Sequence, residues 1–165
     1  MGLHWLMLLL LIAVFAAIEL SDVFPKGSDT RASFRTWHFM LGLTVLVLVG
    51  ARLIAKLVSP TPLINSSIPH WQDRTAKVVQ TLLCALMVAM PVLGWLMLSA
   101  SGNVIPFYGL ELPTLTAKNK ELADTIKEIH EVGATATYVL VGIHAAAAPY
   151  HHYFLRDNTL RRMLP

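Results

Sequence analysis

Residues 125–153 read TIKEIHEVGATATYVLVGIHAAAAPYHHY, and this stretch decides the fold. From Val132 to Pro149 it contains no charged residue, and it continues a helix that begins earlier. A helix needs about 20 mostly apolar residues to cross a lipid bilayer. Two histidines, His130 and His144, lie in this helix, and polar side chains in a spanning helix are costly and indicate function. The stretch therefore predicts a membrane helix with functional histidines.

Three other stretches are also long and mostly apolar, and together with the first they predict the architecture of the chain. They are Leu3–Leu20, Phe39–Val58 and Val78–Ala100. The first lacks a basic start and a small-residue cleavage site, so we expect a membrane helix and not a signal peptide. The sequence predicts an all-α, four-helix transmembrane bundle that forms one domain over residues 1–165. The expected helices are 3–21, 34–58, 75–100 and 125–153.

The composition supports a membrane protein and argues against a nucleic-acid partner. Of the 165 residues 55% are hydrophobic and only 14% are charged. The net charge of +3 does not require a nucleic-acid partner, because lysine and arginine are more frequent in the cytoplasmic loops of membrane proteins. Lysine and arginine number seven on the side of the termini and six on the other. We therefore expect both termini on the cytoplasmic side of the membrane.

The histidines can be compared by their depth in the membrane. His130 and His144 are 14 residues apart, close to four turns, so they point to nearly the same face about 21 Å apart. His38 lies near the outer start of the second helix, at the level of His130. His4 lies at the inner start of the first helix, at the level of His144. This predicts two cross-helix pairs in two layers, although each histidine alone could lie at an interface or bond a neighbouring helix.

Two imidazoles facing each other can hold the iron of a haem. A bare zinc or copper site needs more ligands close together, and none is available at these depths. A haem also needs small residues beside its ligands. Gly42 follows His38 by one turn, and Gly133, Gly142 and Ala145–Ala148 lie near the histidines of the fourth helix. Close helix packing would also explain these small residues.

Cationic residues near the histidines are candidate partners for haem propionates. Arg52 lies 14 residues after His38, on the same helix face at the inner layer. Arg35 and Lys127 each precede an outer-layer histidine by about one turn. A snorkelling Arg52 and solvated Arg35 and Lys127 are the alternatives.

Two further features lie at the ends of the predicted bundle. His151 and His152, at the inner end, could handle protons beside a quinone, or they could simply lie at the interface. The outer connection 101–124 contains Pro106, Pro113, Phe107 and Tyr108, and predicts a partly ordered cap at the membrane surface. Cys84 is the single cysteine, so no disulfide is expected.

Several motifs resemble the bacterial cytochrome b561 family over essentially the whole chain. They are Leu3-His4-Trp5, Trp37-His38-x-x-x-Gly42 with Arg52 beyond it, Pro91-x-x-Gly94, Lys127-x-x-His130-Glu131, Gly142-Ile143-His144 with Ala145–Ala148, His151-His152-Tyr153-Phe154, and the tail Asp157–Pro165. The chain departs from the family at Lys77 and Gln80, where members carry histidines, and in the few residues before His4.

The resemblance implies two b-type haems with iron bound by histidine pairs. His4 and His144 would ligate the inner haem, and His38 and His130 the outer one. It implies a superoxide oxidase, which takes electrons from periplasmic superoxide and reduces ubiquinone. A basic outer rim at Lys26, Arg31, Arg35 and Lys127 could attract the superoxide anion. The alternative is a non-catalytic cytochrome that conducts electrons for a partner dehydrogenase or hydrogenase.

Overall fold

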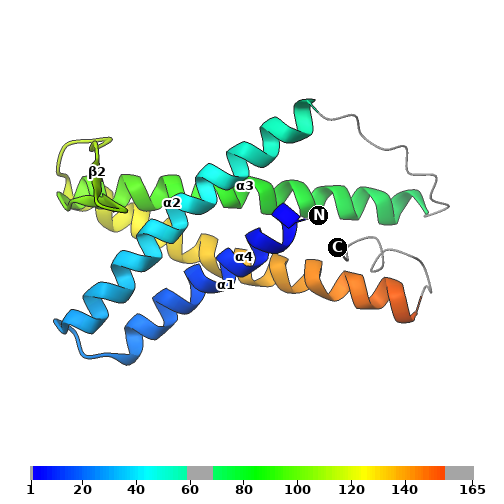
Figure 1. Cartoon of the computed structure of the whole chain (residues 1–165), viewed down its shortest axis with the longest axis horizontal. Coiled ribbons are helices and arrows are strands. Elements are labelled where there is room, and N and C mark those ends of the chain that lie inside the picture. Colours follow the sequence, from blue (N-terminus) through cyan, green and yellow to red (C-terminus); the bar gives the residue numbers. More distant parts are fainter. Residues whose placement is uncertain (1, 59–68, 155–165) are drawn as a thin grey trace.

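The computed structural model describes residues 2–58 and 69–154 and confirms the all-α bundle. These residues form four long helices, α1 to α4, and a short hairpin of strands β1 and β2 between α3 and α4 (Figure 1). All four helices are long and apolar enough to cross a membrane, which makes the chain a multi-pass membrane protein. The bounds are α1 Gly2–Val23, α2 Asp29–Val58, α3 His70–Ser101, β1 Ile105–Phe107, β2 Leu110–Leu112 and α4 Lys120–Tyr153.

Three helices begin five residues earlier than the sequence predicted, because their first turns are polar. At α2 the Ser28 hydroxyl accepts a hydrogen bond from the Arg31 amide (3.3 Å) and closes the first turn. At α4 the Asn119 side chain accepts from the Leu122 amide (3.1 Å) in the same way. Hydrophobicity marks only the part of a helix that lies in the membrane, so these capped polar turns were assigned to loops.

The segment between α3 and α4 is more regular than predicted. β1 and β2 pair antiparallel around Tyr108 and Gly109, which both have positive φ angles. Tyr108 is held in this unusual conformation by contacts with α2. Its hydroxyl lies 3.1 Å from the Thr44 hydroxyl, and its amide donates to the Met40 sulfur (3.5 Å). Trp95 of α3 donates to the Pro113 carbonyl (2.9 Å), which ties the segment to the bundle.

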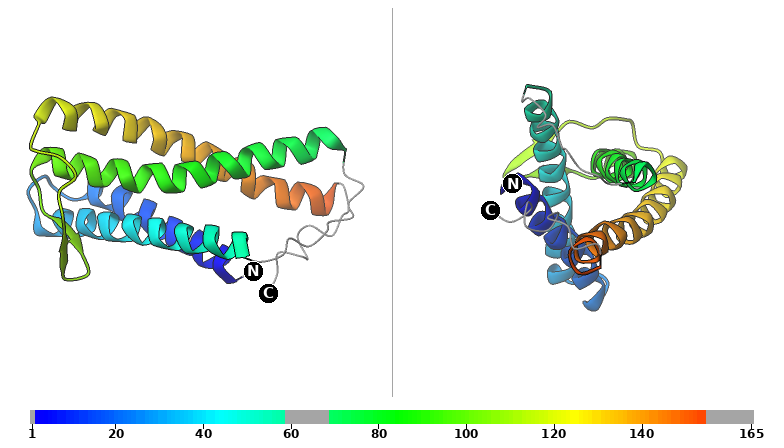
Figure 2. Two further views of the ribbon diagram at one scale, coloured as in Figure 1. Left: turned by 90° about the horizontal axis from the view of Figure 1, so that it is seen from above. Right: turned by 90° about the vertical axis from the view of Figure 1, so that its right-hand side faces the viewer.

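We use this hairpin to name the two ends of the molecule. The hairpin end comprises β1, β2, the end of α1, the start of α2, the end of α3 and the start of α4 (Figure 1). The far end comprises the start of α1 and the end of α4. Figure 2 shows both ends in a side view and in a view along the bundle.

The helices are joined as two pairs, with α4 set apart from the first pair. α1 packs on α2, α3 packs on α4, and the two pairs meet where α2 packs on α3. Within residues 2–58 and 69–154, no Cα atom of α4 comes within 8 Å of a Cα atom of α1 or α2. The backbone of α4 is therefore set apart from the backbones of the first helix pair.

The apolar core reflects this arrangement. One cluster joins α1, α2 and α3 around Met7, Val14, Val45 and Val49. A second joins α2, α3 and the hairpin around Leu43, Leu98 and Ile105. Neither cluster contains a described residue of α4, so this helix is held mainly by its contact with α3.

Gly133 brings α4 close to α3. A Cβ atom at this position would lie 2.5 Å from the Met90 sulfur, so Met90 occupies the space that a side chain would need. The sequence had placed Gly133 among the small residues that leave room for a haem. In the structure its small size serves helix packing instead.

We expect Gly133→Ala to cost about 1 kcal/mol relative to Gly50→Ala, because the end of the flexible Met90 side chain must shift to make room for the added Cβ atom. Gly50→Ala is the matched control, since nothing lies within 4 Å of the added Cβ. The control should be neutral or slightly stabilising, as is usual for Gly→Ala within a helix. Thermal unfolding in detergent measures both. Equal unfolding temperatures for the two variants would contradict the packing role.

Candidate functional site

Two histidine pairs bridge the space between α4 and the first two helices. The ring centres of His38 on α2 and His130 on α4 are 6.4 Å apart, and those of His4 on α1 and His144 on α4 are 6.1 Å apart. All four side chains are half-buried. The structure thus brings together the pairs that the sequence placed at equal depth. Their role as ligands remains a prediction.

The spacing of both pairs fits two imidazoles on opposite sides of one metal ion. A histidine nitrogen lies about 2.0–2.1 Å from a bound first-row metal ion such as zinc. Two such rings in line have their centres a little over 6 Å apart. Two imidazole rings in direct contact with each other could have their centres closer together than this. Among the described residues, no group of three His, Cys, Asp or Glu side chains comes together, so the geometry favours two axial ligands over a multi-ligand metal site.

The backbone of α1 orients His38. Its Nδ1 atom lies 3.0 Å from the Val14 carbonyl oxygen, which can only accept, so Nδ1 carries the proton. This leaves Nε2 as the nitrogen with a free lone pair. Metal-bound histidines commonly donate their other ring nitrogen to a carbonyl in this way. Nδ1 of His130 is buried and has no partner in the described structure.

A cavity of about 580 Å³ surrounds the hairpin-end pair. All four helices line it, and both His38 and His130 face it. Its volume lies in the range of cofactor pockets, about 300–1,000 Å³, and its walls are mostly apolar. The cavity, the paired imidazoles and the free Nε2 atom together fit a flat, apolar, iron-containing group such as a haem.

Two glycines give this cavity its room. Gly42 lines it, and nothing lies within 4 Å of a Cβ added there. Gly94 of α3 lies against the His130 ring, whose Cε1 atom would be 3.6 Å from an added Cβ. Pro91 and Gly94 do not interrupt the helix, since α3 runs through both residues from His70 to Ser101. Only the structure shows that Gly94 is a neighbour of His130.

Arg52 lies near the far-end pair, as its spacing from His38 predicted. Its guanidinium acts electrostatically on both His4 and His144. Among the described residues no carboxylate forms an ion pair with it. A cation in this position suits an acidic group bound between these histidines.

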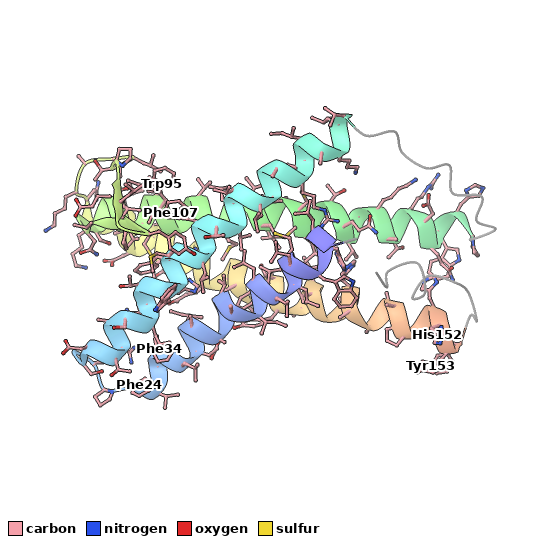
Figure 3. All side chains as sticks on the ribbon, viewed as in Figure 1. Phe24, Phe34, Trp95, Phe107, His152 and Tyr153 are labelled. Carbon is pink, nitrogen blue, oxygen red and sulfur yellow. The ribbon has the colours of Figure 1, made fainter. Side chains whose placement is uncertain are left out.

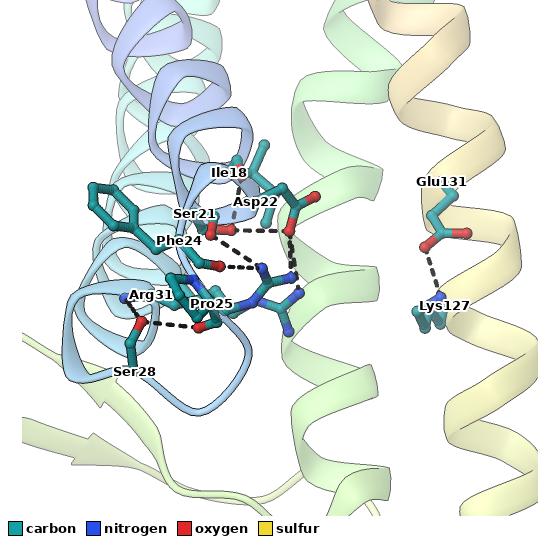
Figure 4. A network of polar contacts seen from close by, with 10 residues as sticks. Ile18, Ser21, Asp22, Phe24, Pro25, Ser28, Arg31, Lys127 and Glu131 are labelled. Carbon is teal, nitrogen blue, oxygen red and sulfur yellow. Dashed lines mark hydrogen bonds and ion pairs between the residues drawn. The ribbon is translucent and has the colours of Figure 1, made fainter.

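The predicted basic rim is only partly available to a ligand. Arg31 is occupied inside the α1–α2 turn, where it contacts the Asp22 carboxylate and donates to the carbonyls of Ser21 (3.2 Å) and Phe24 (2.9 Å) (Figure 4). Lys127 pairs with Glu131 at 2.7 Å. The structure therefore assigns Arg31 to the turn.

Arg35 and Lys26 remain as the rim cations without a close ion pair among the described residues. Arg35 lines both the histidine cavity and a shallow surface pocket over residues 26–35, and it lies 3.7 Å from Asp22. Lys26 lines the same surface pocket and forms no ion pair with the described residues. Arg35 thus connects this surface to the cavity that contains His38.

His151 and His152 lie at the far end of α4, away from both histidine pairs. His151 is seven residues beyond His144, about 10 Å along the helix, and its ring contacts Tyr150. Figure 3 shows His152 and Tyr153 at this end, opposite Trp95 and Phe107. The predicted tail motif, residues 157–165, lies outside the described residues.

The comparison with known proteins agrees with this geometry. The family model described as prokaryotic cytochrome b561 matches residues 1–165. The chain belongs to the prokaryotic cytochrome b561 family. This confirms the resemblance found in the sequence. Members of the cytochrome b561 family are membrane electron-transfer proteins that bind haem b.

Curated relatives support the family assignment over nearly the full chain. Cytochrome b561 homolog 1 of Escherichia coli strain K12 is 39% identical over 99% of this chain and 93% of the relative. A Yersinia pestis protein named probable superoxide oxidase CybB is 37% identical over 99% of this chain and 92% of its own length. Cytochrome b561 homolog 2 of Escherichia coli is 27% identical over 98% and 86%.

We expect Gly94→Leu to lower the haem content of the protein, because the larger side chain would occupy the space beside the His130 ring. Gly94→Ala is the control, since its methyl group would make an ordinary contact at 3.6 Å and should leave haem content unchanged. The measurement is haem per protein chain from the visible spectrum. Full haem content in Gly94→Leu would show that this contact does not limit the site.

Proposed function

We propose that this cytochrome b561 protein binds two b-type haems, one between each histidine pair, and transfers electrons from periplasmic superoxide to ubiquinone. One observation carries the proposal. α4 presents His130 and His144 at two heights, and each faces a histidine of the other helix pair at about the same ring separation. Two such sites stacked along one helix suit electron transfer across a bilayer.

When bound, the two haems would supply one-electron transfer between the two sides of the membrane. The overall reaction balances with two superoxide anions, each losing one electron and leaving as oxygen. One ubiquinone would accept both electrons together with two protons from water. The protein would contribute spacing, burial, charge and access for the two substrates. The name of the Yersinia pestis relative supports this choice of substrate.

The hairpin end would face the periplasm and receive superoxide. The chain offers Lys26, Arg35 and Lys127 there; Lys26 forms no ion pair with the described residues, Arg35 lies 3.7 Å from Asp22, and Lys127 pairs with Glu131. Positive charge at a site entrance raises the encounter rate of a small anion. Arg35 is best placed for this role, because it borders both the surface pocket and the cavity.

The far end would face the cytoplasm, with both termini. We propose that Arg52 pairs with the propionates of the haem held between His4 and His144. His151 lies beyond this pair on α4 and could donate a proton to a reduced quinone at the membrane boundary. The chain has Lys77 and Gln80 where the family resemblance predicts histidines, so we propose His151 for this proton transfer.

The haem assignment is tested by His38→Ala and His130→Ala. We expect each variant to contain one haem per chain where the wild type contains two, because the hairpin-end site loses an axial ligand. Each should retain the spectrum of the far-end haem, which shows that the protein has folded. Two haems per chain in either variant would falsify the assignment.

The superoxide reaction is tested with purified protein in detergent, a superoxide source and a soluble ubiquinone. A superoxide oxidase should reduce the quinone without any added protein. A cytochrome that serves a partner dehydrogenase would be inactive under these conditions, and this result would favour the alternative function.

Arg35→Gln should slow superoxide oxidation several-fold at low ionic strength, because the entrance loses a positive charge. The difference from the wild type should shrink as salt is added, since screening removes long-range attraction. Arg74→Gln is the control, because Arg74 is exposed near the start of α3 at the opposite side of the membrane. A salt-independent loss of activity in Arg35→Gln would argue against attraction of the anion.

A further inference from the structure

The hairpin formed by β1 and β2 reaches the outer side of α2. Both views in Figure 2 show the hairpin extending past α2, on the side away from α3 and α4. Its tip, Tyr108 and Gly109, is fixed on α2 at two points. The Tyr108 hydroxyl lies 3.1 Å from the Thr44 hydroxyl, and the Tyr108 amide donates to the Met40 sulfur at 3.5 Å. The tip therefore covers part of the outer surface of α2.

The part of α2 that the tip contacts lies well inside an uncharged segment. Thr44 is nine residues after Arg35 and eight before Arg52, and no charged residue lies between these two arginines. Nine residues correspond to about 13 Å of helix. Val47 follows Thr44 by about one turn on the same side of the helix, and it is 59% exposed. Since α2 spans the membrane, the surface on which Tyr108 rests continues into a surface that faces lipid.

The two faces of the hairpin differ in polarity, because side chains alternate between the faces of a strand. The face turned toward the bundle is apolar and consists of Ile105, Phe107, Leu110 and Leu112. Three of these side chains pack in the apolar core, but Leu110, next to the tip, is 66% exposed. Glu111 lies on the opposite face beside Pro106 and is exposed. The hairpin is thus amphipathic, and its apolar face continues past the core as an uncovered side chain.

The polar groups at the tip are satisfied within the protein, as a lipid environment requires. Lipid offers no hydrogen bonds, so a backbone amide or a hydroxyl that enters it must find a partner in the protein. Both groups of Tyr108 find theirs on α2, although the residue is 52% exposed. Its backbone also takes a positive φ of 49°, which is uncommon for a residue other than glycine. Tyrosine is enriched where membrane and water meet, because its ring is apolar and its hydroxyl is polar.

We propose that this hairpin is a membrane anchor whose apolar face, with Leu110 and Tyr108, lies in the interfacial layer of the bilayer against phospholipid acyl chains. Glu111 on the other face remains in water. The lipid that covers the outer surface of α2 extends over the hairpin as well. Ile105 of β1 is 1% exposed and also lines the cavity around the hairpin-end histidines. The bilayer therefore helps to hold one wall of that cavity in place.

The test uses single cysteines in the full-length, haem-loaded protein with Cys84→Ala, placed in nanodiscs of phosphatidylcholine and phosphatidylglycerol. Both membrane faces of a nanodisc are open to a water-soluble maleimide, which reacts with the thiolate form of cysteine. Leu110→Cys is the test variant. Glu111→Cys is the matched control for water, and Val47→Cys is the control for lipid. All three side chains are exposed, so the variants should unfold at the temperature of the Cys84→Ala parent.

We expect Leu110→Cys to react about tenfold or more slowly than Glu111→Cys, at a rate close to that of Val47→Cys, because a thiolate does not form readily away from water. After denaturation in sodium dodecyl sulfate all three should react equally. A second measurement identifies what covers the hairpin. Phosphatidylcholine with a photoactivatable group on its acyl chain should cross-link to the peptide that contains residues 104–112, as shown by mass spectrometry of the parent protein.

Two results would overturn the anchor. Equal labelling of Leu110→Cys and Glu111→Cys would place both faces of the hairpin in water. Slow labelling of Leu110→Cys without an acyl-chain cross-link would mean that protein covers this face, either a second copy of the chain or another partner. Neither result depends on the number of haems or on superoxide, so a failure of the anchor is distinguishable from a failure of the proposed function.

Discussion

An imidazole within a membrane must have a partner, and this requirement governs the arrangement of the whole bundle. Lipid offers no hydrogen bonds, so polar side chains in spanning helices face other protein groups or bound ligands. His130 and His144 meet this requirement by pointing across the space between α4 and the first helix pair. The ring separations of 6.4 and 6.1 Å leave room for an ion between the rings but too little for a further layer of side chains.

The packing of the other helices is arranged around that space. α1, α2 and α3 share an apolar core, and α4 is joined to it through α3 at the close approach of Gly133 and Met90. Small residues elsewhere serve a different purpose, since Gly42 and Gly94 border the cavity and keep it open. Glycine therefore allows close packing at one helix interface of this protein and leaves space for the cavity at another.

Much of this architecture could be predicted from the sequence, because the helix length needed to cross a membrane and the periodicity of the helix are strong constraints. The four helices, the depth matching of the histidines and the position of Arg52 follow from counting residues along apolar stretches. Helix starts at Asp29 and Lys120 were missed because capping by the Ser28 and Asn119 side chains depends on local geometry, and the start at His70 was missed because the first turn of α3 is polar.

Features that depend on contacts between distant segments could not be predicted. The turn at Tyr108 and Gly109 lacks a typical hairpin sequence and relies on Met40 and Thr44 of α2. The pairing of Arg31 with the α1–α2 turn could not be predicted, because a count of charges does not show which cations pair with groups of the protein itself. The bond between Glu19 and Tyr138 spans 119 positions in the chain, and only the fold reveals it.

The division of the histidines between the two helix pairs has a consequence for how the protein is assembled. His4 and His38 belong to the first pair, while His130 and His144 belong to the second. On the proposed haem assignment, neither half of the chain would supply both histidines of a pair until the other half has inserted. A ligand that binds only the closed arrangement stabilises it in proportion to its concentration and affinity. If the pairs hold haem as proposed, the bound haem would therefore favour the closed arrangement of the two halves of the chain.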